Sequence, residues 1–107
     1  MGLFDIFNCG NKMDINQAVA DMEDGTILLD VREPEEYNSG HIPGSINTPV
    51  SHPASLLEIV PDRDTKVFVY CRSGSRSGRA QRFLKKNGFS NVVNIGGIRD
   101  YKGPLER

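Results

Sequence analysis

The sequence predicts a single-domain α/β protein with a mostly parallel sheet. The chain has 107 residues, which fits one domain. Short apolar runs alternate along it with amphipathic stretches, and this β-α-β-α order is typical of parallel sheets. The run at 26–31 is almost continuously apolar, as expected of a strand that is covered on both faces. With 37% hydrophobic and 25% charged residues, the composition is that of an ordinary globular domain.

The first half of the chain is predicted to form a helix, a strand, a short helix and a short strand. Asp14 is the expected N-cap of the first helix, with Gln17 in a capping box, and the apolar spacing ends at Gly25. A strand is expected over 26–31 and a short helix over 33–37, with a proline in its first turn. A turn-rich connection over 40–44 then leads to a short strand over 45–47.

The second half repeats the alternation. A helix over 53–60 precedes a strand over 66–70. After the polar run 71–77, a helix is predicted over 78–87, ended by a left-handed cap. A strand over 91–95 follows, the pair Gly96-Gly97 is expected to break it, and a last short helix or turn runs through Asp100 and Tyr101.

The charges are unevenly distributed, although the net charge is only −1. Residues 1–64 carry twelve acidic and three basic residues, whereas residues 65–99 carry eight basic residues and no acid. Cys71 lies inside the basic block, so we expect a positive local field around it. Arg76 and Arg79 lie near a helix start, where a cation is disfavoured. For each of them we weigh an anion-binding role against a solvated helix face.

Cys71 is the candidate nucleophile, because it stands between a buried strand and a helix. A thiol there meets backbone N–H groups and the positive end of the helix dipole, and both favour the thiolate. The small and basic residues that follow would let backbone N–H groups converge as an anion-binding nest. These candidate substrate-binding residues are Arg72, Ser73, Gly74, Ser75, Arg76 and Ser77.

Two chemistries suit a thiolate in such a nest. One is attack on phosphorus or arsenic in an oxyanion, and the other is attack on a sulfane sulfur, which leaves a persulfide on the enzyme. The competing interpretation is a buried, inert cysteine. Asp30 and Arg32 follow a neighbouring strand and could brace the Cys71 loop, since ligands gather at the carboxyl ends of such strands. Alternatively, Asp30 and Arg32 form a structural ion pair or turn.

No metal site or disulfide is indicated. Cys9 and Cys71 cannot be paired from sequence, no secretory signal precedes them, and a reducing, cytoplasmic compartment is therefore the default. His41 is expected to be structural, in a tight turn.

Residues 1–10 form an apolar extension that is too short to span a bilayer. We expect it to dock on the domain rather than on a partner or a membrane.

Two stretches resemble the rhodanese family, the thiosulfate:cyanide sulfurtransferases. The first contains LLDVREPEEY at 28–37 and GHIPGSIN at 40–47. The second contains VYCRSGSRS at 69–77, followed by matching segments at 80–88, 92–95 and the Gly-Gly pair. Both stretches occur in order and together cover roughly residues 13–102.

The resemblance implies a single rhodanese-like domain over 11–107, with a five-stranded, mostly parallel sheet flanked by helices on both faces. It implies that Cys71 carries a persulfide, formed from thiosulfate or another persulfide and passed to a thiophilic acceptor such as cyanide or a thiol. Arg76 matches a position that often shapes substrate preference, and Asp30 and Arg32 match supporting positions. The resemblance implies a small anionic donor, a thiol or protein acceptor, no cofactor and no nucleic acid; the oligomeric state stays open.

Loop length separates sulfur transfer from its alternatives on similar folds. Phosphatases and arsenate reductases that resemble this fold place five residues between cysteine and arginine, whereas four separate Cys71 from Arg76. The smaller pocket favours a sulfur atom over a tetrahedral oxyanion. A non-catalytic docking module is the other alternative. The family commonly places a tryptophan after the Gly-Gly pair, and we expect Tyr101 to fill that packing position.

Overall fold

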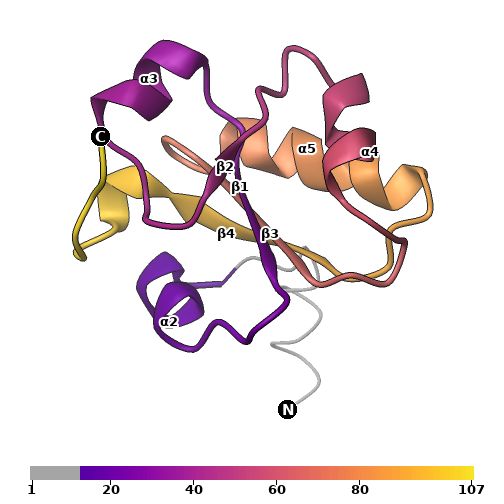
Figure 1. Cartoon of the computed structure of the whole chain (residues 1–107), viewed down its shortest axis with the longest axis horizontal. Coiled ribbons are helices and arrows are strands. Elements are labelled where there is room, and N and C mark those ends of the chain that lie inside the picture. Colours follow the sequence, from indigo (N-terminus) through magenta and orange to yellow (C-terminus); the bar gives the residue numbers. More distant parts are fainter. Residues whose placement is uncertain (1–12) are drawn as a thin grey trace.

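The structure, a computed structural model, describes residues 13–107 and confirms the α/β class. The expected extension at 1–10, with Cys9, lies outside the described residues. Figure 1 shows the order of the elements along the chain. They are α2 (Ile15–Ala20), β1 (Ile27–Asp30), α3 (Pro34–Ser39), β2 (Ile46–Asn47), α4 (Ala54–Ile59), β3 (Val67–Cys71), α5 (Ser75–Lys86), β4 (Val92–Gly97) and the 3-10 turn η1 (Ile98–Asp100).

The strands form one parallel sheet in the order β2-β1-β3-β4. Within residues 13–107 the sheet has four strands, one fewer than the five expected. Met13, the first described residue, donates its backbone N–H to the carbonyl of Asn94 in β4, at 3.2 Å. The described chain therefore meets β4 through one backbone hydrogen bond there, which is too little to form a fifth strand.

Helices cover both faces of the sheet, as predicted. Val67, Val69 and Cys71 pack into a core with residues of α4 and α5. Phe68 and Tyr70 point to the opposite face, because side chains alternate along a strand, and pack into a second core with residues of α2. Figure 1 shows α2 on one side of the strands and α4 and α5 on the other. Tyr101 packs against the α2 core, and its filling of the family's tryptophan position stays a prediction.

Helices α2 and α5 differ from the prediction at their ends, and the expected capping box of α2 is absent. Helix α2 ends at Ala20 rather than near Gly25. Asp14 caps it by accepting from Asn16 N–H at 2.9 Å, but the side chain of Gln17 bonds to Asp21 instead of completing a capping box. Helix α5 begins at Ser75, three residues before the predicted start. Serine and glycine are weak helix formers, so the sequence pattern hid this first turn.

Strand β4 also continues past its predicted end, through Gly96 and Gly97. The expected break is instead a shift in register opposite Val69 and Tyr70, after which Cys71 pairs with Gly97. Gly96 adopts a φ of 100°, which an L side chain rarely does and which makes this irregularity possible. The end of β4 therefore lies directly beside Cys71.

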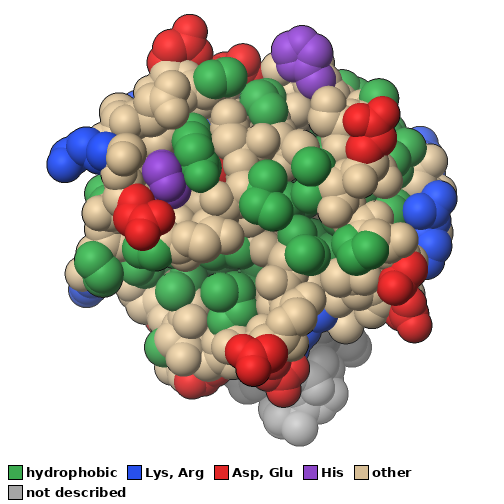
Figure 2. All heavy atoms as spheres, in the orientation of Figure 1, with side chains coloured by type: hydrophobic (Ala, Val, Ile, Leu, Met, Phe, Trp, Pro, Cys, Tyr) green, Lys and Arg blue, Asp and Glu red, His purple; other side chains and the backbone are tan. Residues whose placement is uncertain are grey.

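Figure 2 shows one face of the molecule. On that face lysine and arginine side chains lie at the edges, while hydrophobic side chains are spread in small groups across the middle. The basic residues of segment 65–99 therefore do not form a broad basic surface on this face. Among residues 13–107, no helix combines the length and apolar character needed to cross a bilayer.

Candidate active site

Cys71 is the last residue of β3, and its side chain is buried at 1% exposure. It points to the α4–α5 side of the sheet, where α5 begins four residues later. The turn between β3 and α5 contains only Arg72, Ser73 and Gly74. The sequence placed the cysteine at this junction correctly, but the structure makes the loop shorter and puts Arg76 and Ser77 in the first turn of the helix.

Hydrogen-bond donors converge on the sulfur of Cys71. The backbone N–H of Gly74 lies 3.0 Å from Sγ, and the hydroxyl of Ser77 lies 3.4 Å away. Gly74 adopts a φ of 103°, a left-handed conformation that glycine tolerates, at the point where the chain turns into α5. The Gly74 N–H and the Ser77 hydroxyl thus face the sulfur, whereas anion binding by residues 72–77 stays a prediction.

These donors decide the ionisation of the thiol. Burial alone would raise the pKa of Cys71. The hydrogen bond from the Ser77 side chain and those from the backbone N–H groups of Ser77, Gly74 and Ser73 act in the opposite direction. Together they outweigh burial, so the pKa of Cys71 lies below its ordinary value. The buried sulfur is therefore stabilised as a thiolate.

Asn94 is a residue of the site that the sequence analysis missed. It lies in β4, is 7% exposed, and its Oδ1 lies 2.8 Å from the Ser77 hydroxyl oxygen, so the one hydroxyl hydrogen is shared between Asn94 and the sulfur. Its amide nitrogen donates to the carbonyl of Gly74 at 3.0 Å. Asn94 therefore holds both the loop backbone and the serine that contacts the sulfur. A polar residue within an otherwise apolar strand was the signal that could have identified it.

Gly97 allows β4 to approach the loop closely. A Cβ atom at this position would lie 2.1 Å from the carbonyl oxygen of Arg72 and 2.6 Å from Cα of Ser73. Just beyond it, Arg99 N–H donates to the same Arg72 oxygen at 3.3 Å. The second glycine of the pair is thus needed for close backbone packing against the loop.

Arg76 is paired with an acid from a distant part of the chain. Its guanidinium donates to both oxygens of Glu36, at 2.7 and 2.9 Å, and so joins α5 to α3. Three other predicted loop residues, Arg72, Ser73 and Ser75, are exposed, as is Arg79. An anion-binding role for Arg76 stays a prediction, but its charge is already balanced by Glu36. Sequence could not identify this pair, because its members are 40 residues apart.

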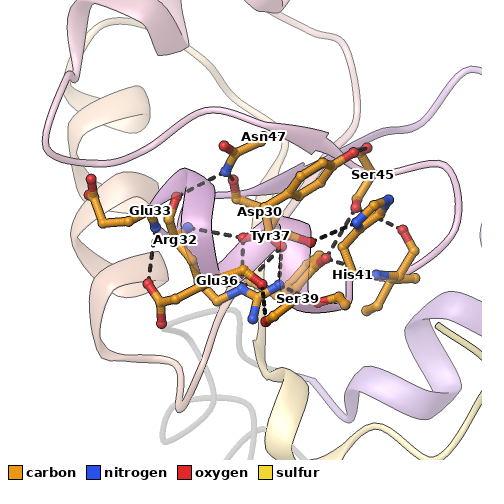
Figure 3. Close-up of polar contacts among 12 residues, drawn as sticks. Asp30, Arg32, Glu33, Glu36, Tyr37, Ser39, His41, Ser45 and Asn47 are labelled. Atoms are coloured by element: carbon orange, nitrogen blue, oxygen red, sulfur yellow. Dashed lines mark hydrogen bonds and ion pairs between the residues drawn. The ribbon is translucent and has the colours of Figure 1, made fainter. Parts of the chain in front are cut away.

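Asp30 and Arg32 form the structural ion pair that was one of their two expected roles. Arg32 donates through Nε and Nη2 to the Asp30 carboxylate, with a shortest distance of 2.6 Å, and both residues are buried. Arg32 also donates to the carbonyl of Gly40 at 2.8 Å. Figure 3 shows the pair together with Asn47, whose amide bonds to the carbonyls of Asp30 and Arg32. Within residues 13–107, their side chains make no hydrogen bond to the loop 71–77.

His41 is structural, as expected. Its ring stacks on Tyr37 at a centroid distance of 3.7 Å, and its Nδ1 atom lies 2.9 Å from the Tyr37 carbonyl. His41 also pairs through its backbone with Glu106 near the chain end. The backbone pairing with Glu106 holds the C-terminal segment beside α3, where Figure 1 shows the end of the chain.

A cavity of about 530 Å³ lies between α2 and η1, on the other side of the sheet from the Cys71 side chain. Its lining includes Ser73 and Gly97 but not Cys71. We therefore define the candidate site by the groups around the sulfur and not by this hollow, since chemistry at a thiolate requires contact with it.

The fold and the site define a class: an α/β protein with a parallel sheet and a cysteine of lowered pKa at the start of a helix. The sequence pattern of the rhodanese-like domain family matches residues 14–103. The chain belongs to this family.

Relatives of known name support this assignment. The chain is 39% identical over 77 residues to the thiosulfate sulfurtransferase PspE of Escherichia coli, covering 71% of this chain and 74% of that protein. It is 41% identical over 93 residues to a sulfurtransferase of Allochromatium vinosum, covering 82% and 84%. A rhodanese-related protein of Thermoplasma volcanium has a similar structure, with a TM-score of 0.78 at 33% identity, covering 90% and 97%.

The names of other relatives are more diverse. The chain also matches a putative sulfur carrier protein of Bacillus subtilis at 38% identity and a tRNA uridine(34) hydroxylase of Escherichia fergusonii at 31%. It spans 46% and 30% of their lengths. Membership of the family therefore supports sulfur transfer without specifying the donor or the acceptor.

Proposed function

We propose that this protein is a sulfurtransferase that carries a sulfane sulfur as a persulfide on Cys71. The observation that carries the proposal is the convergence of the Gly74 N–H and the Ser77 hydroxyl on Sγ, at the start of a helix. A persulfide has its negative charge on the outer sulfur, and donors of this kind stabilise such a charge as well as that of the thiolate.

The reaction proceeds in two half-reactions. The Cys71 thiolate attacks the outer sulfur of thiosulfate, a new S–S bond forms, and the old S–S bond breaks to release sulfite. The enzyme is left with an anionic persulfide. A nucleophile then attacks the outer sulfur, for example cyanide to give thiocyanate or a cellular thiolate to give a new persulfide. The Cys71 thiolate leaves and the cycle closes without an external oxidant or reductant.

The size of the loop favours sulfur over a tetrahedral oxyanion. Only three residues separate Cys71 from α5, and the Gly74 N–H already donates to the sulfur itself. A phosphate or arsenate would need several donors arranged around its oxygens, at a larger distance from Sγ. A single sulfur atom added to Cys71 needs less room, which suits a side chain that is buried at 1% exposure.

We further propose that the first half-reaction uses thiosulfate or a persulfide as donor, and that the protein works in a reducing compartment such as the cytoplasm. The name of the E. coli relative supports thiosulfate as one donor. The name of a yeast relative, thiosulfate:glutathione sulfurtransferase, supports a thiol as acceptor. A free Cys71 thiol is required in each cycle, which suits a reducing environment.

Intact mass spectrometry after thiosulfate treatment tests the function. Wild type should gain one sulfur atom, about 32 Da, which cyanide then removes. Cys71→Ser should gain none. A gain on Cys71→Ser, which retains Cys9, would refute the assignment of the sulfur-carrying residue.

Hydrolysis of an aryl phosphate or thiol-dependent arsenate reduction, without sulfur uptake, would instead favour the oxyanion chemistries. Absence of all three activities would favour a docking module.

A further inference from the structure

Arg76 is a half-buried arginine in the first turn after the Cys71 loop, and it forms an ion pair with Glu36. Both Nη atoms of Arg76 are used, at 2.7 and 2.9 Å, and the side chains are 28% and 33% exposed. The arrangement is bidentate, which fixes the plane and the direction of the guanidinium. A second anion could contact Arg76 only at its remaining edge.

Arg76 lies in the first turn of α5, directly before Ser77, whose hydroxyl is 3.4 Å from the sulfur of Cys71. Its pKa is raised, chiefly by the hydrogen bond with Glu36 and against the effect of burial, and the negative charge of Cys71 adds to the rise. The pKa of Glu36 is lowered to about 2, mainly by Arg76, so this carboxylate is charged at neutral pH. The region beside Cys71 therefore contains a fixed negative charge as well as a positive one.

We propose that Glu36 is a specificity-determining residue, which withholds Arg76 from the donor and shifts the preference of the site from dianionic toward monoanionic sulfur donors. The inference rests on the proposed sulfurtransferase function. Thiosulfate is a dianion at neutral pH, whereas alkyl persulfides and alkyl thiosulfonates carry a single charge. A fixed carboxylate repels the dianion twice as strongly as the monoanion at the same distance.

Two sulfur donors that differ in net charge, but give the same product on Cys71, test this inference. Thiosulfate and methanethiosulfonate both offer a sulfane sulfur bonded to an oxidised sulfur, and attack by the Cys71 thiolate gives the same persulfide. The first releases sulfite and the second methanesulfinate, so atoms and charges balance in both. The ratio of their second-order rates of sulfur uptake then measures the selectivity for the dianion.

Glu36→Gln is a suitable variant because it removes the charge and keeps the local structure. Glu36 Oε1 accepts from the backbone N–H of Glu33 at 3.0 Å, as part of the capping box of α3. Glutamine serves in such a box equally well. Glu35→Gln is the matched control, since Glu35 lies in the same helical turn but is exposed.

The experiment measures the rate of mass gain on Cys71 with each donor at low ionic strength. We expect Glu36→Gln to accelerate uptake about threefold for each negative charge on the donor, hence roughly tenfold for thiosulfate and threefold for methanethiosulfonate. The rate ratio should thus rise about threefold, and added salt should reduce the change. Glu35→Gln should leave the ratio near that of wild type.

Each other outcome overturns the inference. An unchanged or lower ratio in Glu36→Gln, with both donors still used and the melting temperature retained, would show that Glu36 does not set selectivity. An equal rise in Glu35→Gln would show an effect of overall charge alone. Failure of wild type to gain sulfur from either donor would refute the proposed function itself, which is a distinguishable result.

Discussion

Cys71 combines two properties that oppose each other, deep burial and a lowered pKa. An isolated thiolate in a core is unfavourable, because its charge loses the solvation of water. The donors around this sulfur replace that solvation, and the largest single contribution that lowers the pKa comes from the Ser77 side chain. Ser77 is itself buried and held by Asn94. The reactivity of Cys71 thus depends on two other buried residues, Ser77 and Asn94.

Removing the Ser77 hydroxyl should therefore make Cys71 less acidic. In Ser77→Ala we expect the pKa of Cys71 to rise, because a hydrogen bond to the charged form, worth about 1.5 kcal/mol or more, is lost. Persulfide formation from thiosulfate should slow about tenfold at neutral pH. The measurement is the pH dependence of the rate of sulfur uptake, whose midpoint should move upward.

Ser75→Ala is the control for this prediction, since Ser75 lies in the same turn of α5 but is exposed. In Ser75→Ala, the midpoint of the pH dependence of sulfur uptake should match that of wild type. If both variants had the same midpoint as wild type, the backbone donors alone would account for the acidity of Cys71.

At the scale of elements, the site forms where β3, α5 and the end of β4 meet. The turn after β3 is so tight that the backbone of β4 packs against it without an intervening side chain. This contact at Gly97 leaves no room for a Cβ atom. The position of the loop is therefore determined by strand pairing and not by the loop sequence alone.

Gly97→Ala should displace the turn. The added methyl group would overlap backbone atoms of Arg72 and Ser73, which cannot move without altering the donors around Sγ. We expect a loss of about 1–3 kcal/mol in the free energy of unfolding, together with a large loss of sulfur uptake in the protein that remains folded. Chemical denaturation and mass spectrometry measure the two effects.

Gly78→Ala is the matched comparison. A Cβ atom there would meet Asn94 at 3.5 Å, an ordinary contact, and Gly78 lies inside α5. The substitution should be neutral or stabilising by up to about 1 kcal/mol, because alanine favours helix. Equal destabilisation by both alanines would contradict the role of close packing at Gly97.

The link between α3 and α5 should depend on pH. The folded-state pKa of Glu36 is about 2, below its ordinary value of 4.5. Its contribution to stability is thus fully present above about pH 4.5 and is lost as the pH falls toward 2. The difference in free energy of unfolding between wild type and Glu36→Gln should be at most about 1 kcal/mol at pH 6. It should shrink on acidification; a difference that stays constant to pH 2 would argue against the pair.

At the scale of the whole molecule, a buried polar network holds the carboxyl edge of the sheet to the segment that follows β1. Asp30 and Arg32 form its centre, with Arg32 bonded to the Gly40 carbonyl. Tyr70 extends it, since its hydroxyl contacts the Ser45 hydroxyl and the Ile42 N–H, each at 3.1 Å. Tyr70 directly precedes Cys71, so this network supports the strand that presents the sulfur.

Breaking the ion pair between Asp30 and Arg32 should lower the free energy of unfolding strongly. Arg32→Met leaves the Asp30 carboxylate buried without its partner, and we expect a loss of about 3–5 kcal/mol in the free energy of unfolding by urea. Adding Asp30→Leu should recover part of that loss, because a hydrophobic pair avoids an isolated buried charge. A loss below about 1 kcal/mol in Arg32→Met, similar to that of a surface substitution, would contradict the burial argument.

Much of this architecture is encoded locally. Apolar runs marked β1, β3 and β4, because a strand covered on both faces has few polar residues. The position of Cys71 between strand and helix identified the candidate nucleophile, because a thiol there meets backbone N–H groups and the positive end of the helix dipole. Local patterns failed at the start of α5 and the end of β4, where the chain is stabilised by the sulfur and by strand pairing rather than by propensity.

The sequence by itself determined the α/β class, the order of the elements, the cysteine at the strand end and the small residues that follow it. Only the tertiary structure decided which groups surround the sulfur: Asn94 behind Ser77, Gly97 against the loop, and Glu36 on Arg76. The physical reason is the distance along the chain over which each kind of interaction acts. Propensity and periodicity act over neighbouring residues, whereas a hydrogen bond, a close contact or an ion pair depends on distances in space that folding alone creates.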